Sequence, residues 1–136
     1  MKRRFMNDSE DKLPKNRVPA IRVLAMPKDA NPTGDIFGGW IISHADTAGA
    51  VAAMKRSSGR VATVAVNNFE FKKPVFVGDL LSCYTEILKV GRTSMTIKVT
   101  AYAERDSREK CVIKVTEATI VYVALDENRK PRPVDD

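Results

Sequence analysis

The sequence predicts one α+β domain in which a long helix is wrapped by a five-stranded antiparallel sheet. The chain has 136 residues, which is enough for one hydrophobic core and too few for two. An alanine-rich segment without proline, residues 39–55, is followed by four long segments of strand-like apolar character. All seven prolines lie outside these segments, as expected where proline is excluded from helix interiors and central strands.

The first part of the chain is predicted to hold an arm, a short strand and a loop. Residues 1–16 form a flexible basic arm, the domain spans 17–128, and a tail covers 129–136. The first strand is expected at 20–26. Residues 27–37 contain two prolines, a glycine and several turn-forming Asn and Asp side chains, so they are predicted to form a loop.

Residues 39–55 are predicted to form the single helix. One side repeats apolar and small residues at helical spacing, and the opposite side is apolar as well. The residues of the two sides are Ile41, Ala45, Ala48 and Ala52, and Trp40, Ile42, Ala50, Val51 and Met54. We therefore expect a helix that is buried nearly all round, with its alanines and Gly49 permitting close neighbours.

After Gly59 the pattern changes to that of strands. The four predicted strands cover 61–71, 80–90, 94–104 and 111–125. The third alternates apolar and polar residues, which predicts one buried and one wetter face. Short connections join the last three, so an antiparallel meander is expected. Because such long strands leave edges that need cover, we also expect pairing with a second copy, as a homodimer.

Composition and charge exclude several classes of protein. No apolar run reaches the roughly 20 residues of a membrane span, because the longest candidate is interrupted by His44 and Asp46. The N-terminus has no apolar signal segment and Cys83 and Cys111 have no framework spacing, which predicts a cytoplasmic protein with free thiols. Half of the net charge of +6 lies in the first 20 residues. The sequence has no zinc-finger spacing, no basic helix and no basic-aromatic motif, so it gives no indication of nucleic-acid binding.

The loop before the helix carries the most informative chemistry. Asp35 lies just upstream of Gly38 and Gly39, and the N–H groups of a first helical turn favour negative charge. Such amides can hold an oxyanion, and a carboxylate suffices as general base or nucleophile toward a thioester. Helix capping is the alternative role for Asp35, although it lies rather far upstream for an N-cap.

Other catalytic constellations fail on inspection. A serine triad needs a histidine base, and the only histidine, His44, is on the helix without any Gly-x-Ser-x-Gly elbow in the chain. Residues 34–39 match neither a dinucleotide fingerprint nor a phosphate loop. One His and two distant Cys do not make a zinc site, so we expect no metal and no cofactor.

Residues 26–40, MPKDANPTGDIFGGW, resemble the signature of hotdog-fold acyl-CoA thioesterases, with the YciA-like bacterial acyl-CoA thioester hydrolases as the nearest type. Residues 71–79, FKKPVFVGD, are similar to the end of the family's second strand and the turn after it, and 114–123 resemble its last strand. The resemblance covers 17–133. The loop and helix signature is specific within the hotdog group, whereas the Pro-x-x-x-Gly-Asp turn is shared more widely.

The resemblance implies hydrolysis of acyl-CoA to a free acid and CoA. Asp35 would be the catalytic carboxylate, and the backbone amide of Gly39 would stabilise the oxyanion. Asp46 matches an acidic position of the family and is either an auxiliary acid or a buried structural one. The family's acyl group enters between two subunits, and its YciA-like members are trimers of dimers, so a homohexamer is implied.

The phosphates of CoA call for basic side chains between solvent and Asp35. The residues predicted to bind CoA or the acyl group are Asn31, Gly38, Lys73, Arg92, Thr93 and Ser94. Further basic residues at strand ends and in the tail are Arg60, Lys72, Lys130 and Arg132. For any single one of these cations, a solvated surface position is the alternative.

Three other functions stay open at this point. A non-catalytic hotdog domain would bind acyl-CoA without cleaving it. A hydratase or dehydratase would need a histidine at the loop, where His44 does not lie. The basic arm would offer a site for anionic surfaces or RNA.

Overall fold

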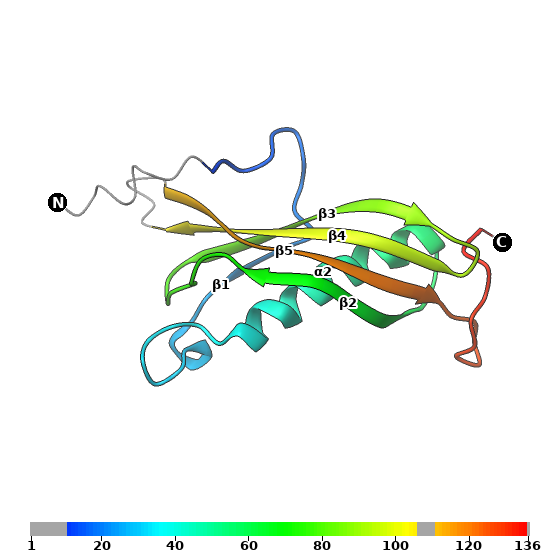
Figure 1. Ribbon diagram of the computed structural model, residues 1–136, viewed down its shortest axis with the longest axis horizontal. Coiled ribbons are helices and arrows are strands. Elements are labelled where there is room, and N and C mark those ends of the chain that lie inside the picture. The colour runs from blue at the N-terminus through cyan, green and yellow to red at the C-terminus, as the bar shows by residue number, and fades with distance from the viewer. Residues whose placement is uncertain (1–10, 106–110, 136) are drawn as a thin grey trace.

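The computed structural model describes residues 11–105 and 111–135, and it has one long helix lying along one face of a five-stranded antiparallel sheet (Figure 1). The predicted fold class is confirmed. The elements are β1 (Ile21–Leu24), the 3₁₀ turn η1 (Pro27–Asp29), α2 (Gly38–Ser57), β2 (Val61–Phe71), β3 (Leu80–Val90), β4 (Ser94–Arg105) and β5 (Cys111–Ala124). Among the described residues, no helix is long and apolar enough to cross a membrane.

The strand order is β1-β3-β4-β5-β2, which places β1 and β2 at the two edges. The meander predicted for the last three strands is confirmed, because β3 pairs with β4 and β4 with β5, all antiparallel. The first strand is shorter than predicted, since it pairs only with Leu80–Cys83 at the start of β3. The connection expected over 105–110 lies largely outside the described residues.

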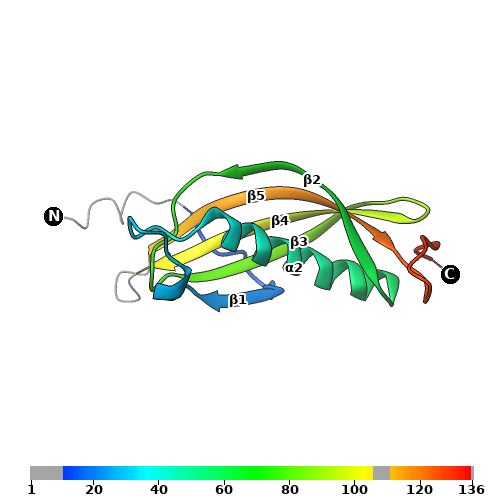
Figure 2. The same ribbon diagram turned by 90° about the horizontal axis from the view of Figure 1, so that it is seen from below.

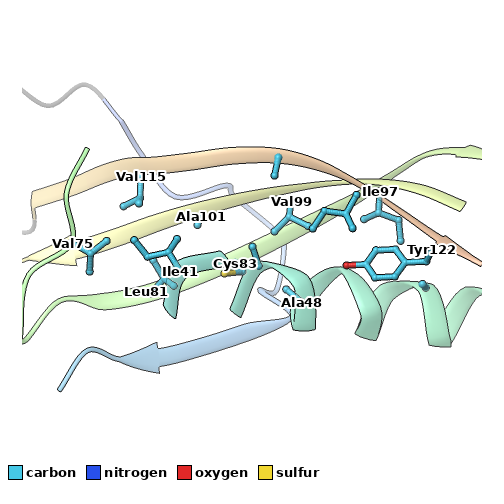
Figure 3. Packing of buried hydrophobic residues seen from close by; sticks show 14 of the residues in the cluster. Ile41, Ala48, Val75, Leu81, Cys83, Ile97, Val99, Ala101, Val115 and Tyr122 are labelled. Atoms are coloured by element: carbon cyan, nitrogen blue, oxygen red, sulfur yellow. The ribbon is translucent and has the colours of Figure 1, made fainter. Parts of the chain in front are cut away.

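The sheet curves around α2, and the hydrophobic core fills the space between them (Figures 2 and 3). The alternation predicted for β4 is confirmed, with each inward-facing side chain fully buried; these are Met95, Ile97, Val99, Ala101 and Ala103. Ile41 and Ala48 of the helix face Leu81, Cys83 and Val99 of the sheet. The alternation of apolar and polar residues along β4 therefore identified the face of the strand that packs in the core.

The helix is buried on one side only, which corrects the expectation of burial nearly all round. Ala45 and Ala48 are fully buried against the sheet, whereas Ile42 and Met54 on other sides are 37% and 43% exposed. The reason is that the sheet covers a single face of the helix, and within residues 11–105 and 111–135 no second layer covers the rest. The close approach expected at Gly49 is present, because a Cβ there would overlap the Tyr122 hydroxyl.

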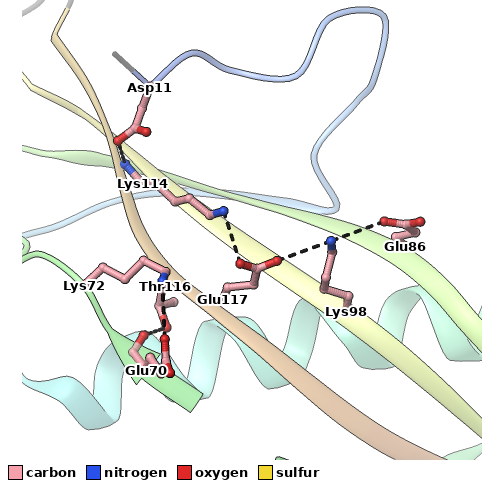
Figure 4. A network of polar contacts seen from close by, with 8 residues as sticks. All are labelled: Asp11, Glu70, Lys72, Glu86, Lys98, Lys114, Thr116 and Glu117. Atoms are coloured by element: carbon pink, nitrogen blue, oxygen red, sulfur yellow. Dashed lines mark hydrogen bonds and ion pairs between the residues drawn. The ribbon is translucent and has the colours of Figure 1, made fainter. Parts of the chain in front are cut away.

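The first and last described segments of the chain contact the helix and the sheet. Arg132 donates to the carbonyl of Ser57 at 2.7 Å and so satisfies one of the free carbonyls at the end of α2. Val134 is buried, and Arg56 pairs with Asp135 at 2.7 Å. At the other terminus, Asp11 accepts from the backbone N–H of Lys114 at 2.7 Å, beside a network of Lys98, Lys114, Glu86 and Glu117 on the outer face of the sheet (Figure 4).

A buried ion pair fixes the turn before β3. Asp79 is only 2% exposed, and its carboxylate accepts from Nε and Nη2 of Arg105 at 3.0 and 2.8 Å and from the Phe76 N–H at 2.9 Å. Arg105 also donates to the carbonyl of Pro74 at 3.1 Å and lies 4.4 Å from the ring centre of Phe76. The Asp79–Arg105 pair therefore holds the segment 74–79 against the end of β4.

Cys83 is expected to resist thiol reagents in the folded chain. It is fully buried in β3, and burial raises the pKa of its thiol to about 12. At pH 8 about 1 in 10,000 such thiols is ionised, and only the thiolate reacts. We expect Cys111→Ser, which leaves Cys83 as the single thiol, to react with Ellman's reagent only after unfolding in guanidinium. Rapid reaction of the native variant would contradict the burial.

Candidate active site

A cleft of about 340 Å³ lies between the N-terminal end of α2 and the segment that follows β2. Its walls come from the loop before the helix, the first helical turn, and the end of β2 with the four residues after it. The lining residues are Asn31, Asp35, Ile36, Gly38, Ile41, Phe71, Lys72, Lys73, Pro74 and Val75. The structure thus brings together four of the residues predicted for the site: Asn31, Asp35, Gly38 and Lys73.

Asn31 organises the loop that carries Asp35. Its side-chain oxygen accepts from the N–H groups of Thr33 and Asp35 at 2.9 and 3.0 Å, and its own N–H donates to the Asp35 carbonyl at 2.6 Å. Gly34 takes a positive φ of 97°, a conformation that glycine adopts without strain. The N–H of Ile36 then donates to the Val75 carbonyl at 2.9 Å, which ties the loop to the far wall of the cleft.

Asp35 does not cap the helix. The N-cap residue of α2 is Phe37, whose side chain makes no capping hydrogen bond. The half-buried Asp35 side chain lines the cleft instead, and within the described parts of the chain no hydrogen bond to its carboxylate is found. The carboxylate is therefore available to a bound molecule.

The first turn of α2 contributes backbone N–H groups for which a helix has no acceptor of its own. Gly38 lies in the wall of the cleft. A Cβ at this position would be 3.0 Å from the Phe71 ring, so glycine keeps the space between the helix and that ring open. Gly39 is exposed and is not one of the lining residues. Of the two glycines, Gly38 is thus the one in the cleft wall.

Asp46 lies about two helical turns further along α2 than Gly38, and two hydroxyl groups hold its side chain. Its Oδ1 accepts from the Thr63 hydroxyl at 2.7 Å and from the Tyr122 hydroxyl at 3.1 Å. Tyr122 also contacts the Asp46 carbonyl at 2.7 Å, and burial, reinforced by the charge of Asp46, raises the pKa of Tyr122 far above its usual value. Tyr122 therefore remains a donor, and it fixes the orientation of a half-buried carboxylate beside β2.

The remaining predicted binding residues are not brought to this cleft within one chain. Arg92 and Thr93 lie in the turn between β3 and β4, and Ser94 begins β4. The segments that line the cleft lie beyond the opposite ends of these strands (Figure 1). The 11 residues of β3 span about 35 Å. Among the other cations considered, Lys72 pairs with Glu70 at 3.3 Å, and Arg132 is occupied by the helix carbonyl.

Sequence reasoning did not single out Thr63, Tyr122 or Phe71. Thr63 and Tyr122 belong to different strands and meet Asp46 only in the folded chain, so no local motif marks them. Phe71 was predicted only as the end of a strand, although its ring forms a wall of the cleft. His44 packs edge-on against Trp40 with ring centres 4.5 Å apart, and burial lowers its pKa.

The fold and the cleft define a class of protein: a hotdog domain with a cleft at the amino end of its central helix, lined by one carboxylate and two lysines. Residues 33–110 match the family model described as Thioesterase superfamily. The acyl-CoA thioester hydrolase YciA of Escherichia coli K12 is 43% identical over 114 residues, which cover 82% of this chain and 86% of that protein. The chain belongs to the thioesterase superfamily.

Solved structures agree with this assignment. The hexameric hotdog-fold thioesterase Cj0915 of Campylobacter jejuni is 43% identical with a TM-score of 0.81, covering 85% of this chain and 89% of that one. HI0827, a hexameric broad-specificity acyl-coenzyme A thioesterase, is 42% identical with a TM-score of 0.84, covering 94% and 88%. The hotdog fold expected from the sequence is confirmed.

A more distant relative is informative about particular residues. Structures of an acyl-CoA hydrolase from Staphylococcus aureus have 26% and 25% identity and TM-scores of 0.77, and cover 85% of this chain and 70% of that one. In one of these structures an aspartate is replaced by alanine, and in the other a threonine 17 positions further along is replaced by alanine.

Proposed function

We propose that this chain is an acyl-CoA thioesterase that hydrolyses acyl-CoA to a free carboxylic acid and CoA. The observation that carries the proposal is the cleft that Asp35, a carboxylate, lines together with Gly38, the first residue of the helix. Membership of the thioesterase superfamily and the names of the relatives support the same reaction. Two free, buried cysteines are compatible with a cytoplasmic enzyme of fatty acid metabolism.

The reaction needs the helix N-terminal amides and one carboxylate. The thioester carbonyl oxygen accepts from the helix N-terminal amides, which stabilise the negative charge that develops on it. A carboxylate takes a proton from water, the water oxygen bonds to the carbonyl carbon, and the C–S bond breaks. The CoA thiolate leaves and recovers the proton. If the carboxylate attacks the carbonyl carbon itself, water cleaves the resulting anhydride in a second step.

Two carboxylates are available for this role. Asp35 is the residue predicted from the sequence, and it lines the cleft. A specific observation favours Asp46: it is bonded to Thr63, 17 positions further along, which is the spacing of the two residues replaced in the S. aureus hydrolase. Asp46 is also the more firmly oriented of the two, because two hydroxyl groups donate to one of its oxygens. We assign proton transfer or attack to Asp46 and substrate contact in the cleft to Asp35.

The minimum active unit is a homodimer formed through β2. This strand is an open edge of 11 residues, and Val64 and Val66 on it are 56% and 44% exposed. A two-fold axis normal to the sheet would pair β2 with its copy in antiparallel fashion and keep both helices on one face. Thr63, which holds Asp46, lies on this edge strand, so the second copy would border the carboxylate. The hexameric relatives support a trimer of such dimers.

Thiol release from purified protein tests the proposal. We expect CoA to appear when acetyl-, butyryl- and longer acyl-CoAs are added, as followed with Ellman's reagent, and light scattering to give the mass of a hexamer. A stable complex with acyl-CoA that persists for hours without thiol release would instead identify the non-catalytic binding domain. A monomer with full activity would refute the dimeric site.

A further inference from the structure

Tyr122 of β5 extends across the core from the sheet to α2, with its hydroxyl toward the helix (Figure 3). Its side chain is fully buried, and the hydroxyl oxygen lies 2.7 Å from the Asp46 carbonyl oxygen and 3.1 Å from Oδ1 of the same residue. Gly49 permits this approach, because a Cβ at that position would overlap the hydroxyl. A large side chain on the sheet and a glycine on the helix together bring one hydroxyl to one acidic residue.

The contact restrains the Asp46 side chain relative to its own backbone. A tyrosine hydroxyl has a single proton, which is shared here between the two acceptors. Because both acceptors belong to Asp46, the hydroxyl limits the torsion angles that place the carboxylate beside the helix. Thr63 adds a second restraint, since its hydroxyl donates to the same Oδ1 at 2.7 Å from the edge strand β2. Oδ1 is thus held from two different strands.

The other carboxylate oxygen of Asp46, Oδ2, has no hydrogen-bond partner within residues 11–105 and 111–135. It is not buried either, because the one buried side-chain oxygen or nitrogen without a partner in these ranges is Oγ of Ser82. A carboxylate oxygen has about two acceptor positions, and the two hydroxyls fill those of Oδ1. Oδ2 is therefore the oxygen that is open to water or to a bound thioester.

We infer that Tyr122 is a positioning residue for hydrolysis: with Thr63 it occupies Oδ1 of Asp46 and leaves Oδ2 as the oxygen that reacts. The inference rests on the proposed function. Oδ2 takes a proton from water as the water oxygen bonds to the carbonyl carbon, and the proton passes to the CoA thiolate when the C–S bond breaks. If Oδ2 attacks the carbon itself, the thiolate leaves and water then cleaves the anhydride.

The effect of Tyr122 belongs in the chemical step. Its hydroxyl is buried and engaged with Asp46, so it has no direct contact to offer to a substrate. A carboxylate that is already oriented does not have to be ordered during the reaction, and this preorganisation raises the rate. An interaction that acts on the transition state and not on substrate binding appears in kcat and leaves KM unchanged.

Removing the Tyr122 hydroxyl gives the kinetic test. In Tyr122→Phe, which keeps the ring, we expect kcat for acyl-CoA hydrolysis to fall about 5- to 10-fold and KM to change less than about 2-fold. Tyr102→Phe is the matched control, because it removes a hydroxyl from a ring that packs against Tyr84 on β3. A rise in KM with kcat unchanged, or an equal effect in the two variants, would overturn the inference.

The Asp46→Asn background shows whether Tyr122 acts through the carboxylate. Asparagine takes no proton and does not attack a carbonyl, so adding Tyr122→Phe to Asp46→Asn should change the residual kcat less than about 2-fold. A role of the hydroxyl in packing alone would lower kcat by the same factor in both backgrounds. Equal factors would therefore refute the inference.

Infrared spectroscopy tests the contact without any turnover. In protein with isotope-labelled aspartate carboxyl groups, the difference between each protein and its Asp46→Asn counterpart isolates the carboxylate bands of Asp46. These bands should shift in Tyr122→Phe, because a lost donor at Oδ1 changes the balance of the two C–O bonds, and stay in place in Tyr102→Phe. Bands that do not shift would refute the inference. A shift in a protein that releases no thiol would refute the proposed function and confirm that Tyr122 holds Asp46.

Discussion

Replacing Asp46 by asparagine is expected to lower kcat for acyl-CoA hydrolysis by about 1,000-fold. Asparagine preserves the shape of the side chain and can still accept from the hydroxyls of Thr63 and Tyr122, which lie 2.7 and 3.1 Å from Oδ1. It removes the negative charge and the capacity to take a proton or attack a carbonyl. The measurement is steady-state thiol release with one short and one long acyl-CoA.

Asp35→Asn and Thr63→Val serve as comparisons. Asp35 lines the cleft without a hydrogen-bonded carboxylate in the described chain, so its replacement should act mainly on KM, with a smaller fall in kcat. Thr63→Val keeps the shape but loses one donor to Asp46, for which we expect a fall in kcat of about 10-fold. A loss of kcat that is larger in Asp35→Asn than in Asp46→Asn would assign the reacting carboxylate to Asp35.

Arg105→Ala is expected to lower the free energy of unfolding by about 3 to 5 kcal/mol. It would leave the carboxylate of Asp79, which is 2% exposed, without the guanidinium that lies 2.8 Å away. A buried charge that loses its partner is costly because the interior does not solvate it. The segment 74–79 would also lose the hydrogen bond that Arg105 donates to the Pro74 carbonyl, next to the cleft.

Urea denaturation followed by circular dichroism measures this effect, with Arg22→Ala as the matched control. Arg22 pairs with Glu104 at 3.4 Å, but its side chain is 53% exposed, so its loss should cost no more than about 1 kcal/mol. Equal losses in the two variants would show that the buried pair adds nothing beyond a surface one.

Much of the fold could be predicted because local patterns report it directly. The alternation along 94–104 identified the buried face of β4, and the glycines and charged turns bounded β2 and β3 at the residues where the structure has them. The one-sided burial of α2 could not be predicted in this way, since Ile42 and Met54 are as apolar as the residues that the sheet covers. Hydrophobicity does not say which of two apolar faces the chain itself will cover.

The candidate site was predictable only where its residues are neighbours in the sequence. Asn31, Asp35 and Gly38 lie in one loop and the helix that follows it, and they do line one cleft. The pair of Asp46 and Thr63 joins a helix to an edge strand, so it becomes visible only once the register of the sheet is known. The separation of Arg92 from the cleft likewise follows from strand direction, which residue identity does not encode.

Helix α2 sets the scale of the molecule. It runs from the cleft at Gly38 to the carbonyl of Ser57 that Arg132 occupies, a distance of about 30 Å for its 20 residues. Both ends of the helix contact segments remote in sequence, so the length of the helix sets the distance between the cleft and the opposite end of the subunit. Adding or removing one turn would change this distance by about 5 Å and would shift the cleft relative to the contact with Arg132.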